Sequence, residues 1–228
     1  MKNLKRELKI TEDGSHTLFV PELNEHYHST HGAIQEAMHV YLNAGFNYCD
    51  QNPIHILEVG FGTGLNCFLT LMEAQKQKRQ VVYHSIELYP IQEEHIQSLN
   101  YTDQIERADK AVFFKLHQAI WNQEVKITED FTLEKLQGDL RSFQFPASYD
   151  LIYFDAFAPD IQPELWTQDI FEKLHHHLKE EAILTTYSTK GIIKQALRAA
   201  GFEVKRLPGP PGKRQMLRAK KSNIHINI

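Results

Sequence analysis

The sequence has only two cysteines and no long apolar run. Cys49 and Cys67 stand alone, without a Cys-x-x-Cys pair, so neither a disulfide framework nor a zinc ribbon is expected. No segment approaches the ~20 apolar residues of a membrane-spanning helix. The N-terminal residues, Met1 to Glu7, lack the apolar core of a signal peptide. These absences predict a cytoplasmic protein with no membrane association.

Acidic residues are nearly missing from the C-terminal end. Residues 190–228 contain ten lysines and arginines and a single acid, Glu203, so they carry +9, whereas the 189 residues before them carry −13. A basic end on an acidic body indicates a polyanionic partner that docks at one side. Solvated lysines near a terminus would give the same pattern, so the charge alone leaves both interpretations open.

The rest of the composition is that of an ordinary globular protein. At 228 residues, 42% of them hydrophobic and 24% charged, the chain can bury a full core. No repeat, linker or low-complexity tract interrupts it. We predict an N-terminal extension over residues 1–45 that packs on one structural unit over residues 46–228.

A strand, a glycine turn and a helix are predicted in succession from residue 54. The apolar run over 54–59 is typical of a buried strand, and apolar residues recur at helical spacing from Leu65. Between them stand Gly60, Gly62 and Gly64. Glycines let the backbone approach a ligand, and the first turn of a helix presents unpaired N–H groups. The segment therefore predicts a nucleotide site, although a tight turn that binds nothing is the alternative.

The glycine spacing argues against a dinucleotide. The Gly-x-Gly-x-x-Gly fingerprint would place its third glycine at position 65, which is leucine. The pattern from Glu58 to Gly64, Glu-x-Gly-x-Gly-x-Gly, instead resembles the first motif of S-adenosylmethionine-dependent methyltransferases.

Acids at two later strand ends support a nucleoside ligand. A strand over 81–86 ends at Glu87-Leu88, where a carboxylate can accept the hydroxyls of a ribose and repel a 2′-phosphate. A third strand, over 131–136, ends at Gly138-Asp139, a pair that often lies beside the adenine ring in this fold. Each acid alone is explained equally well as a solvated turn residue.

Asp155 is the candidate reacting group. It ends a strand that begins at Tyr149, and a loop to Pro159 follows; ligands of open α/β sheets bind beyond such carboxyl ends. Methyl transfer to an amine needs alignment, and it needs a group that orients the amine and takes its proton. Phe157 can wall the transfer pocket or stack on a base. A capping role is the alternative for Asp155.

Residues 24–32 are polar and rich in histidine. His26, His28 and His31 resemble metal ligands in type, but no thiolate or second cluster accompanies them. We expect no metal, and predict a loop that faces the cofactor or the substrate.

The remaining periodicities complete an α/β chain. They predict further strands over 17–20, 182–187, 202–207 and 215–219, and helices over 33–43, 90–99, 109–121, from Pro163 onward, and 191–200. The last two strands form an antiparallel hairpin. The expected fold is a Rossmann-like class I methyltransferase: a mostly parallel sheet with a C-terminal antiparallel hairpin and a small N-terminal β/α extension.

Several segments resemble one family of these methyltransferases. Residues 155–167, Asp-Ala-Phe-Ala-Pro-Asp-Ile-Gln-Pro-Glu-Leu-Trp-Thr, are similar to its signature Asp-Gly-Phe-Ala-Pro-x-x-x-Pro-x-x-Trp-Thr. Residues 184–189, 199–202 and 212–216 are similar too, as is the segment from Tyr27 to Glu36. The family is the methyltransferase domain of the bifunctional tRNA 5-methylaminomethyl-2-thiouridine biosynthesis protein. The resemblance runs from about residue 15 to the C-terminus.

The resemblance implies methylation of the amine of 5-aminomethyl-2-thiouridine at the tRNA wobble position, with S-adenosyl-L-methionine as cofactor. The implied catalytic residues are Asp155 and Phe157. The implied cofactor-binding residues are Glu58, Gly60, Phe61, Gly62, Gly64, Asn66, Glu87, Leu88, Gly138, Asp139 and Asp155. The implied substrate-binding residues are Tyr27, His28, Lys213 and Arg214. The basic hairpin would hold phosphates of the tRNA anticodon arm.

Two departures from the family pattern leave alternatives open. Ala156 stands where the family usually has glycine. The chain also stops where bifunctional members continue into a flavin-dependent oxidase domain, so we expect no flavin domain in this chain and another source for the amine. The alternatives are an N-methyltransferase for a small molecule or a protein, and a non-catalytic protein that binds S-adenosylmethionine or RNA.

Overall fold

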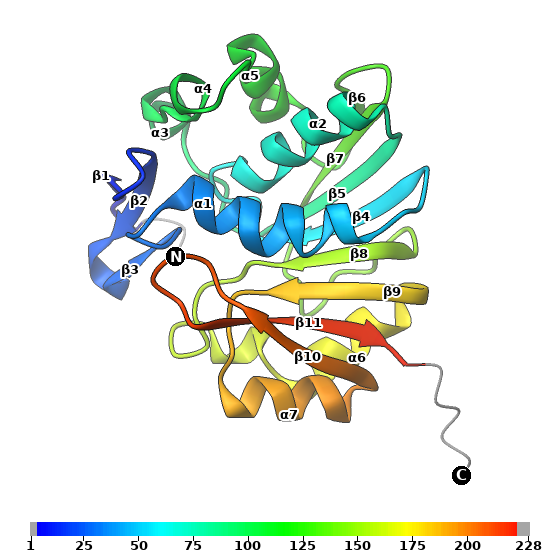
Figure 1. Cartoon of the computed structure of the whole chain (residues 1–228). Helices are drawn as coiled ribbons and strands as arrows, with labels where there is room; N and C mark the ends of the chain where they lie inside the picture. The colour runs from blue at the N-terminus through cyan, green and yellow to red at the C-terminus, as the bar shows by residue number, and fades with distance from the viewer. Residues whose placement is uncertain (1–3, 223–228) are drawn as a thin grey trace.

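The computed structural model describes residues 4–222, and its centre is an eight-stranded sheet with helices on both faces (Figure 1). Five central strands are parallel, and the pairs at both edges are antiparallel. In spatial order the strands are β10 (Phe202–Pro208), β11 (Gln215–Lys221), β9 (Leu178–Thr186), β8 (Tyr149–Phe154), β4 (Ile54–Val59), β5 (Val81–Glu87), β7 (Phe131–Gln137) and β6 (Glu124–Lys126).

Both faces of the central strands are buried because alternate side chains point to opposite sides. On β4, Ile54 and Ile56 join the apolar core on one face, and Leu57 and Val59 join the core on the other. Helices α2 (Leu65–Gln77) and α5 (Lys110–Gln118) contribute to the first core. Helices α6 (Gln168–His176) and α7 (Gly191–Ala199) cover the second core.

The order of the strands creates a site at one edge. From β4 the chain proceeds outward through β5 and β7, then returns to the other side of β4 as β8. Ligands of open α/β sheets bind at such a reversal, beyond the carboxyl ends of the strands. The site is therefore expected above β4 and β8.

The N-terminal extension lies at that edge (Figure 1). Strands β1 (Glu7–Ile10), β2 (His16–Val20) and β3 (Glu25–His26) form a separate antiparallel sheet. Asn100 ties this sheet to the core, because its side chain accepts from the His16 N–H and donates to the Gly14 carbonyl. Helix α1 (Ala33–Ala37) follows and continues as the π-helical η2 (Met38–Asn43).

The predicted α/β fold is confirmed, with differences at several element ends. The helix predicted from Pro163 is instead a 3-10 turn, η4 (Pro163–Leu165), and α6 starts only after the Thr167 side chain caps it. The polar helix predicted over 90–99 is only α3 (Glu93–Ser98), and β9 begins four residues before the predicted strand. Strands β1 and β6 and the one-turn helix α4 (Tyr101–Gln104) were not predicted. Within residues 4–222, no helix is both long and apolar enough to cross a membrane.

Candidate active site

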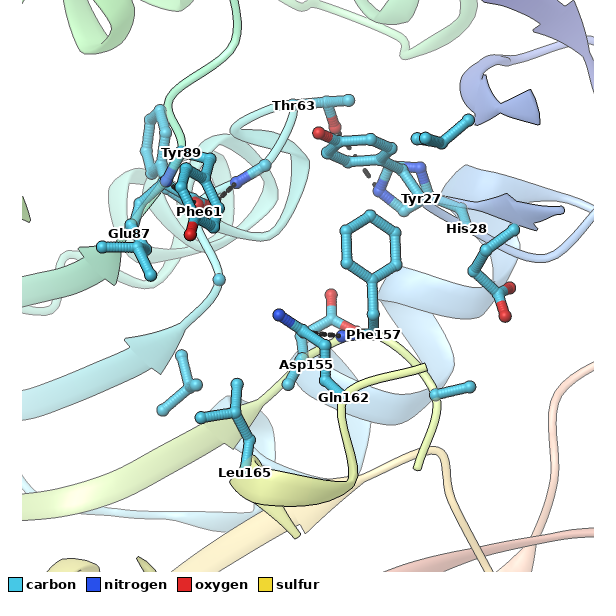
Figure 2. Close-up of a pocket in the computed structure, with 18 of the residues that line it drawn as sticks. Tyr27, His28, Phe61, Thr63, Glu87, Tyr89, Asp155, Phe157, Gln162 and Leu165 are labelled. Atoms are coloured by element: carbon cyan, nitrogen blue, oxygen red, sulfur yellow. Dashed lines mark hydrogen bonds between the residues drawn. The ribbon is translucent and has the colours of Figure 1, made fainter. Parts of the chain in front are cut away.

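A cavity of about 370 Å³ opens beyond the carboxyl ends of the parallel strands (Figure 2). Much of its wall comes from five segments that are far apart in the sequence. These segments contribute residues 60–63, 86–89, 138–141, 155–158 and 25–30. The predicted nucleotide motif, the two strand-end acids, the Asp155 loop and the histidine-rich segment therefore meet at one place.

Two glycines shape the floor of this cavity. Gly60 has a φ of +93°, and a Cβ built on it would lie 2.7 Å from the Asp155 carbonyl oxygen. Gly62 has a φ of +49°, and its Cβ would lie 3.2 Å from the Tyr27 ring. The backbone approaches its neighbours this closely only because these residues have no side chain. A ligand therefore meets main-chain groups at this floor.

Glu87 is fixed at the side of the cavity. Its Oε2 accepts a hydrogen bond from the Gly62 N–H at 3.2 Å, and its Oε1 accepts one from the Tyr89 N–H at 2.8 Å. A carboxylate has about four lone-pair sites, so two remain for the hydroxyls of a ribose. Figure 2 shows Glu87, Phe61 and Tyr89 on one side of the cavity, with Tyr27, His28 and Phe157 on the other.

Asp155 lies between these two sides, and its carboxylate is held by two donors. Tyr41 donates its hydroxyl to Oδ1 at 2.6 Å, and Asn66 donates its amide Nδ2 to Oδ2 at 2.8 Å. Burial raises the pKa of Asp155 to about 6, although both donors favour the charged form. The carboxylate is thus oriented, and it is basic enough to accept a proton near neutral pH.

The loop after Asp155 is rigid because side chains of the same sequence segment hold it. The Phe157 N–H donates to Gln162 Oε1 at 3.1 Å, and the Phe157 carbonyl accepts from Trp166 Nε1 at 2.8 Å. The Phe157 ring contacts the Tyr27 ring edge-to-face, with 5.1 Å between the ring centroids. The two rings form an aromatic wall next to Asp155, which suits a planar base.

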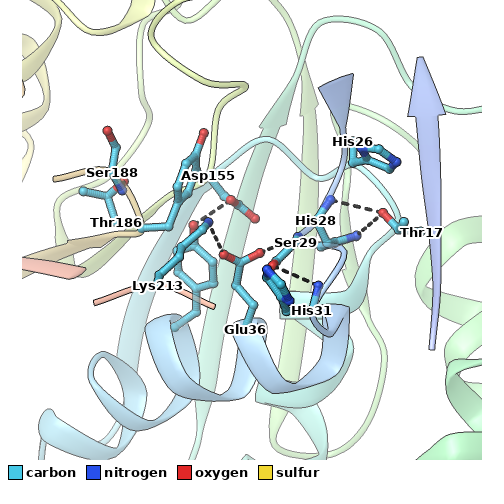
Figure 3. Close-up of polar contacts among 12 residues, drawn as sticks. Thr17, His26, His28, Ser29, His31, Glu36, Asp155, Thr186, Ser188 and Lys213 are labelled. Atoms are coloured by element: carbon cyan, nitrogen blue, oxygen red, sulfur yellow. Dashed lines mark hydrogen bonds and ion pairs between the residues drawn. The ribbon is translucent and has the colours of Figure 1, made fainter. Parts of the chain in front are cut away.

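His28 lies on the same side of the cavity as Tyr27 and Phe157 (Figure 2), and its imidazole is uncharged at neutral pH. Burial lowers its pKa to about 4. Its Nδ1 lies 3.2 Å from Thr17 Oγ1 (Figure 3), and its Nε2 lies 3.4 Å from Thr63 Oγ1 (Figure 2). The imidazole therefore joins the N-terminal sheet to the glycine loop. No group of three or more histidine, cysteine, aspartate or glutamate side chains in the described chain is arranged to hold a metal ion.

The structure brings most of the predicted site residues together. Those that line the cavity are Gly60, Phe61, Gly62, Asn66, Glu87, Leu88, Gly138, Asp139, Asp155, Phe157, Tyr27, His28 and Lys213. Three others do not line it. Glu58 is fully buried in the sheet and accepts a hydrogen bond from Ser85 Oγ at 2.6 Å. Gly64 is the residue before the first turn of α2. Arg214 is exposed in the hairpin turn.

Three polar residues of the site were not predicted from the sequence. Glu36 and Tyr187 line the cavity, and Tyr41 holds Asp155 from behind it. Tyr41 occurs in the predicted helix over 33–43 as part of its apolar face, and Glu36 occurs in the segment that carried the family resemblance. Neither position showed by itself that its side chain reaches the carboxyl end of β8.

Comparisons with known proteins identify the family of the chain. Residues 101–222 match the sequence model of a family described as S-adenosyl-L-methionine-dependent methyltransferase. The bifunctional tRNA 5-methylaminomethyl-2-thiouridine biosynthesis protein MnmC of Burkholderia multivorans is 31% identical over 92% of this chain and 34% of its own length. MnmC of Cupriavidus metallidurans is 28% identical over 96% of this chain and 34% of its own length. The chain thus spans about a third of the length of the curated relatives it matches.

Solved structures are similar over the same region. The crystal structure of MNMC2 from Aquifex aeolicus covers 97% of this chain and 71% of its own, with 26% identity and a TM-score of 0.80. Spermidine synthase from Thermotoga maritima covers 96% of this chain and 75% of its own, at 13% identity and a TM-score of 0.54, and shares the fold alone. The family model spans more than half of the chain and includes Asp155. The chain therefore belongs to the S-adenosyl-L-methionine-dependent methyltransferases.

Proposed function

We propose that this methyltransferase acts on the amine of 5-aminomethyl-2-thiouridine at the wobble position of tRNA. The observation that carries the proposal is the similarity to MNMC2, which extends over 97% of the chain. It therefore includes the N-terminal extension and the C-terminal hairpin, whose Tyr27, Glu36 and Lys213 line the cavity. We also propose that residues 1–45 and 46–228 work as one unit, because both line this cavity.

The residues present fit S-adenosyl-L-methionine, which supplies a methyl group on a sulfonium when bound. The floor at Gly60 and Gly62 admits a ligand against main-chain groups, and Glu87 has lone pairs for a ribose. Asp139 also lines the cavity, and we place the adenine side there. Such contacts fix the donor, and alignment is the main requirement of an in-line displacement.

We assign the acceptor to the opposite side of the cavity. Phe157 and Tyr27 would hold the base against their aromatic wall, as proteins that read splayed-out RNA bases do. The Asp155 carboxylate would orient the amine and take a proton from it, since only the neutral amine has a free lone pair for attack. Tyr41 and Asn66 keep that carboxylate aimed during the transfer.

Basic side chains at the rim support an RNA acceptor. Arg141 and Lys213 line the cavity but pair with Asp139 and Glu36. Arg6 also lines the cavity, and the exposed Arg214 is next to Lys213. Such residues can neutralise phosphates of an anticodon arm. We accordingly place the activity in the cytoplasm, where tRNA is used in translation.

Part of the C-terminal positive charge is neutralised within the protein. Lys190 pairs with Asp160, Lys220 with Glu181 and Lys221 with Glu180, while Arg218 stacks on Tyr48. The net charge of +9 therefore overstates the charge free for RNA. Arg214 is the better candidate for a phosphate contact.

The proposal is tested with tRNA that carries 5-aminomethyl-2-thiouridine. The purified protein and labelled S-adenosyl-L-methionine are incubated with this tRNA, which is then digested for nucleoside mass analysis. A gain of one CH2 unit on that nucleoside is expected, and a far slower gain with Asp155→Asn. A wild-type protein that binds the cofactor but leaves the nucleoside unchanged would contradict the proposal.

We expect kcat/KM for this reaction to fall below about pH 6. The pKa of Asp155 is about 6, so the carboxylate that accepts the proton is lost as the pH drops through that value. Tyr41→Phe removes a donor that favours the charged form, so it should move the acidic limb to higher pH. Rates from about pH 5 to about pH 9 measure both effects.

The control for this experiment is Tyr48→Phe, which changes an exposed tyrosine. Ionisation of the substrate amine shapes the profile on the alkaline side equally in all three proteins. An acidic limb at the same pH in the wild type and in Tyr41→Phe would show that the titrating group is not Asp155.

A further inference from the structure

A buried carboxylate other than Asp155 lines the cavity. Glu36, in the first turn of α1, is 7% exposed. Its Oε2 accepts a hydrogen bond from the Ser29 N–H at 2.7 Å, and its Oε1 accepts one from Lys213 Nζ. The main-chain bond fixes the position of the carboxylate, and the lysine supplies its counter-charge.

Lys213 reaches this carboxylate from another part of the chain. It lies in the turn between β10 and β11, and its side chain remains 33% exposed. Its ammonium group lies 4.3 Å from the centre of the Tyr187 ring. Tyr187 donates its hydroxyl to the Ala156 carbonyl at 2.9 Å, so the ring is fixed beside the residue that follows Asp155.

The carboxylate and the ring together make a receptor for an alkylammonium group. A charge-assisted hydrogen bond to a carboxylate and the face of an aromatic ring are the two contacts that bind such cations best. Both parts are rigid, whereas the lysine is a flexible chain with one exposed end. Figure 3 shows Asp155, Lys213 and Glu36 pointing toward one another. The receptor is therefore next to the predicted proton acceptor.

We propose that Glu36 and Tyr187 bind the protonated amine of the acceptor, and that the Lys213 ammonium fills this site until the acceptor enters. The amine character of the acceptor rests on the proposed function. The exchange replaces one primary ammonium with another, so the buried carboxylate always has a partner, as buried charges require. The displaced Lys213 is then free to turn toward the mouth of the cavity.

The test compares a charged and a neutral probe on protein saturated with S-adenosylhomocysteine. Affinities for benzylammonium and for benzyl alcohol are measured by calorimetry. Glu36→Gln keeps the size of the side chain and an acceptor for the Ser29 N–H. The substitution should weaken the binding of benzylammonium about tenfold, which is the effect of one charge-assisted hydrogen bond. The affinity for benzyl alcohol should not change.

The lysine variant gives the opposite expectation. Lys213→Met keeps an apolar chain of similar length but removes the competing cation, so benzylammonium should bind several-fold more tightly. Lys205→Met, which changes an exposed lysine on β10, is the matched control and should bind like the wild type. Weaker benzylammonium binding in Lys213→Met, or equal losses for both probes in Glu36→Gln, would overturn the proposal.

A second measurement separates this inference from the proposed function. Anticodon stem-loops that carry 5-aminomethyl-2-thiouridine or its 5-hydroxymethyl analogue are bound to the same proteins. If the tRNA is not methylated but benzylammonium binding depends on Glu36, the proposed function fails and the ammonium site stands. If the tRNA is methylated while Glu36→Gln still prefers the aminomethyl stem-loop as strongly as the wild type, the ammonium site alone is refuted.

Discussion

Replacing Asp155 with asparagine is expected to lower kcat for methyl transfer by about 10³-fold, within the range of a lost general base. The amide cannot take a proton from the amine, yet it has the size of the carboxylate and its oxygen still accepts from Tyr41. Asp155→Ala should lose at least as much activity, since it also removes the group that orients the acceptor. Single-turnover rates at saturating tRNA and cofactor measure the effect directly.

The same variants should bind S-adenosyl-L-methionine nearly as the wild type does. The Gly60 and Gly62 backbone and the Glu87 carboxylate remain in place, so the dissociation constant should change by less than about threefold, below ~0.7 kcal/mol. Calorimetric titration checks this. Asp160→Asn is the matched control, because Asp160 is exposed in the same loop and pairs with Lys190. If Asp155→Asn transferred the methyl group as fast as the wild type, Asp155 would not be the proton acceptor.

Local sequence patterns were sufficient to predict that several of these residues line one cavity. The glycine turn and Asp155 each follow a strand directly, and Glu87 is the last residue of β5. The carboxyl ends of neighbouring parallel strands meet at one edge of the sheet. A strand assignment therefore places its next residue at the cavity without knowledge of the tertiary contacts. This is why three motifs separated by nearly a hundred residues could be combined from the sequence.

Glu58 shows where the same argument has a limit. It is only two residues before Gly60, but it lies within β4, where alternate side chains point to opposite faces of the sheet. Its carboxyl is directed to the covered face that Ile54 and Ile56 share, and burial raises its pKa well above the usual value. At this position, one residue before the end of β4, the side chain does not line the cavity.

The acceptor side was less predictable because its residues come from both ends of the chain. Glu36 is on a helix near the N-terminus, and Lys213 is in a turn near the C-terminus. Their pairing depends on how the extension packs against the hairpin, for which the sequence carries no periodic signal. The short edge strands β1 and β6 escaped prediction for a related reason: most of their residues are exposed or half-buried, so they lack an apolar pattern.

Gly60→Ala is expected to lower both the stability of the protein and its affinity for the cofactor. The φ of +93° is strained for alanine, at a cost of about 1–2 kcal/mol. The new Cβ would also lie 2.7 Å from the Asp155 carbonyl oxygen, and relief of such overpacking costs about 1–3 kcal/mol more. The free energy of unfolding in urea should therefore fall by about 2–5 kcal/mol.

The effect on binding follows from which atoms must move to accommodate the new methyl group. The carbonyl that it meets belongs to Asp155, so relief of the clash separates the glycine loop from the Asp155 loop, the two segments that meet above β4 and β8. S-adenosyl-L-methionine should then bind at least about 100-fold more weakly, a loss of ~2.7 kcal/mol. Gly191→Ala is the matched control, because Gly191 begins α7 and a Cβ there meets nothing within 4 Å. That variant should bind S-adenosyl-L-methionine as the wild type does, and its free energy of unfolding should rise by up to ~1 kcal/mol. If Gly60→Ala behaved like Gly191→Ala, the close approach of the two loops would be dispensable, and the glycine at position 60 would need another explanation.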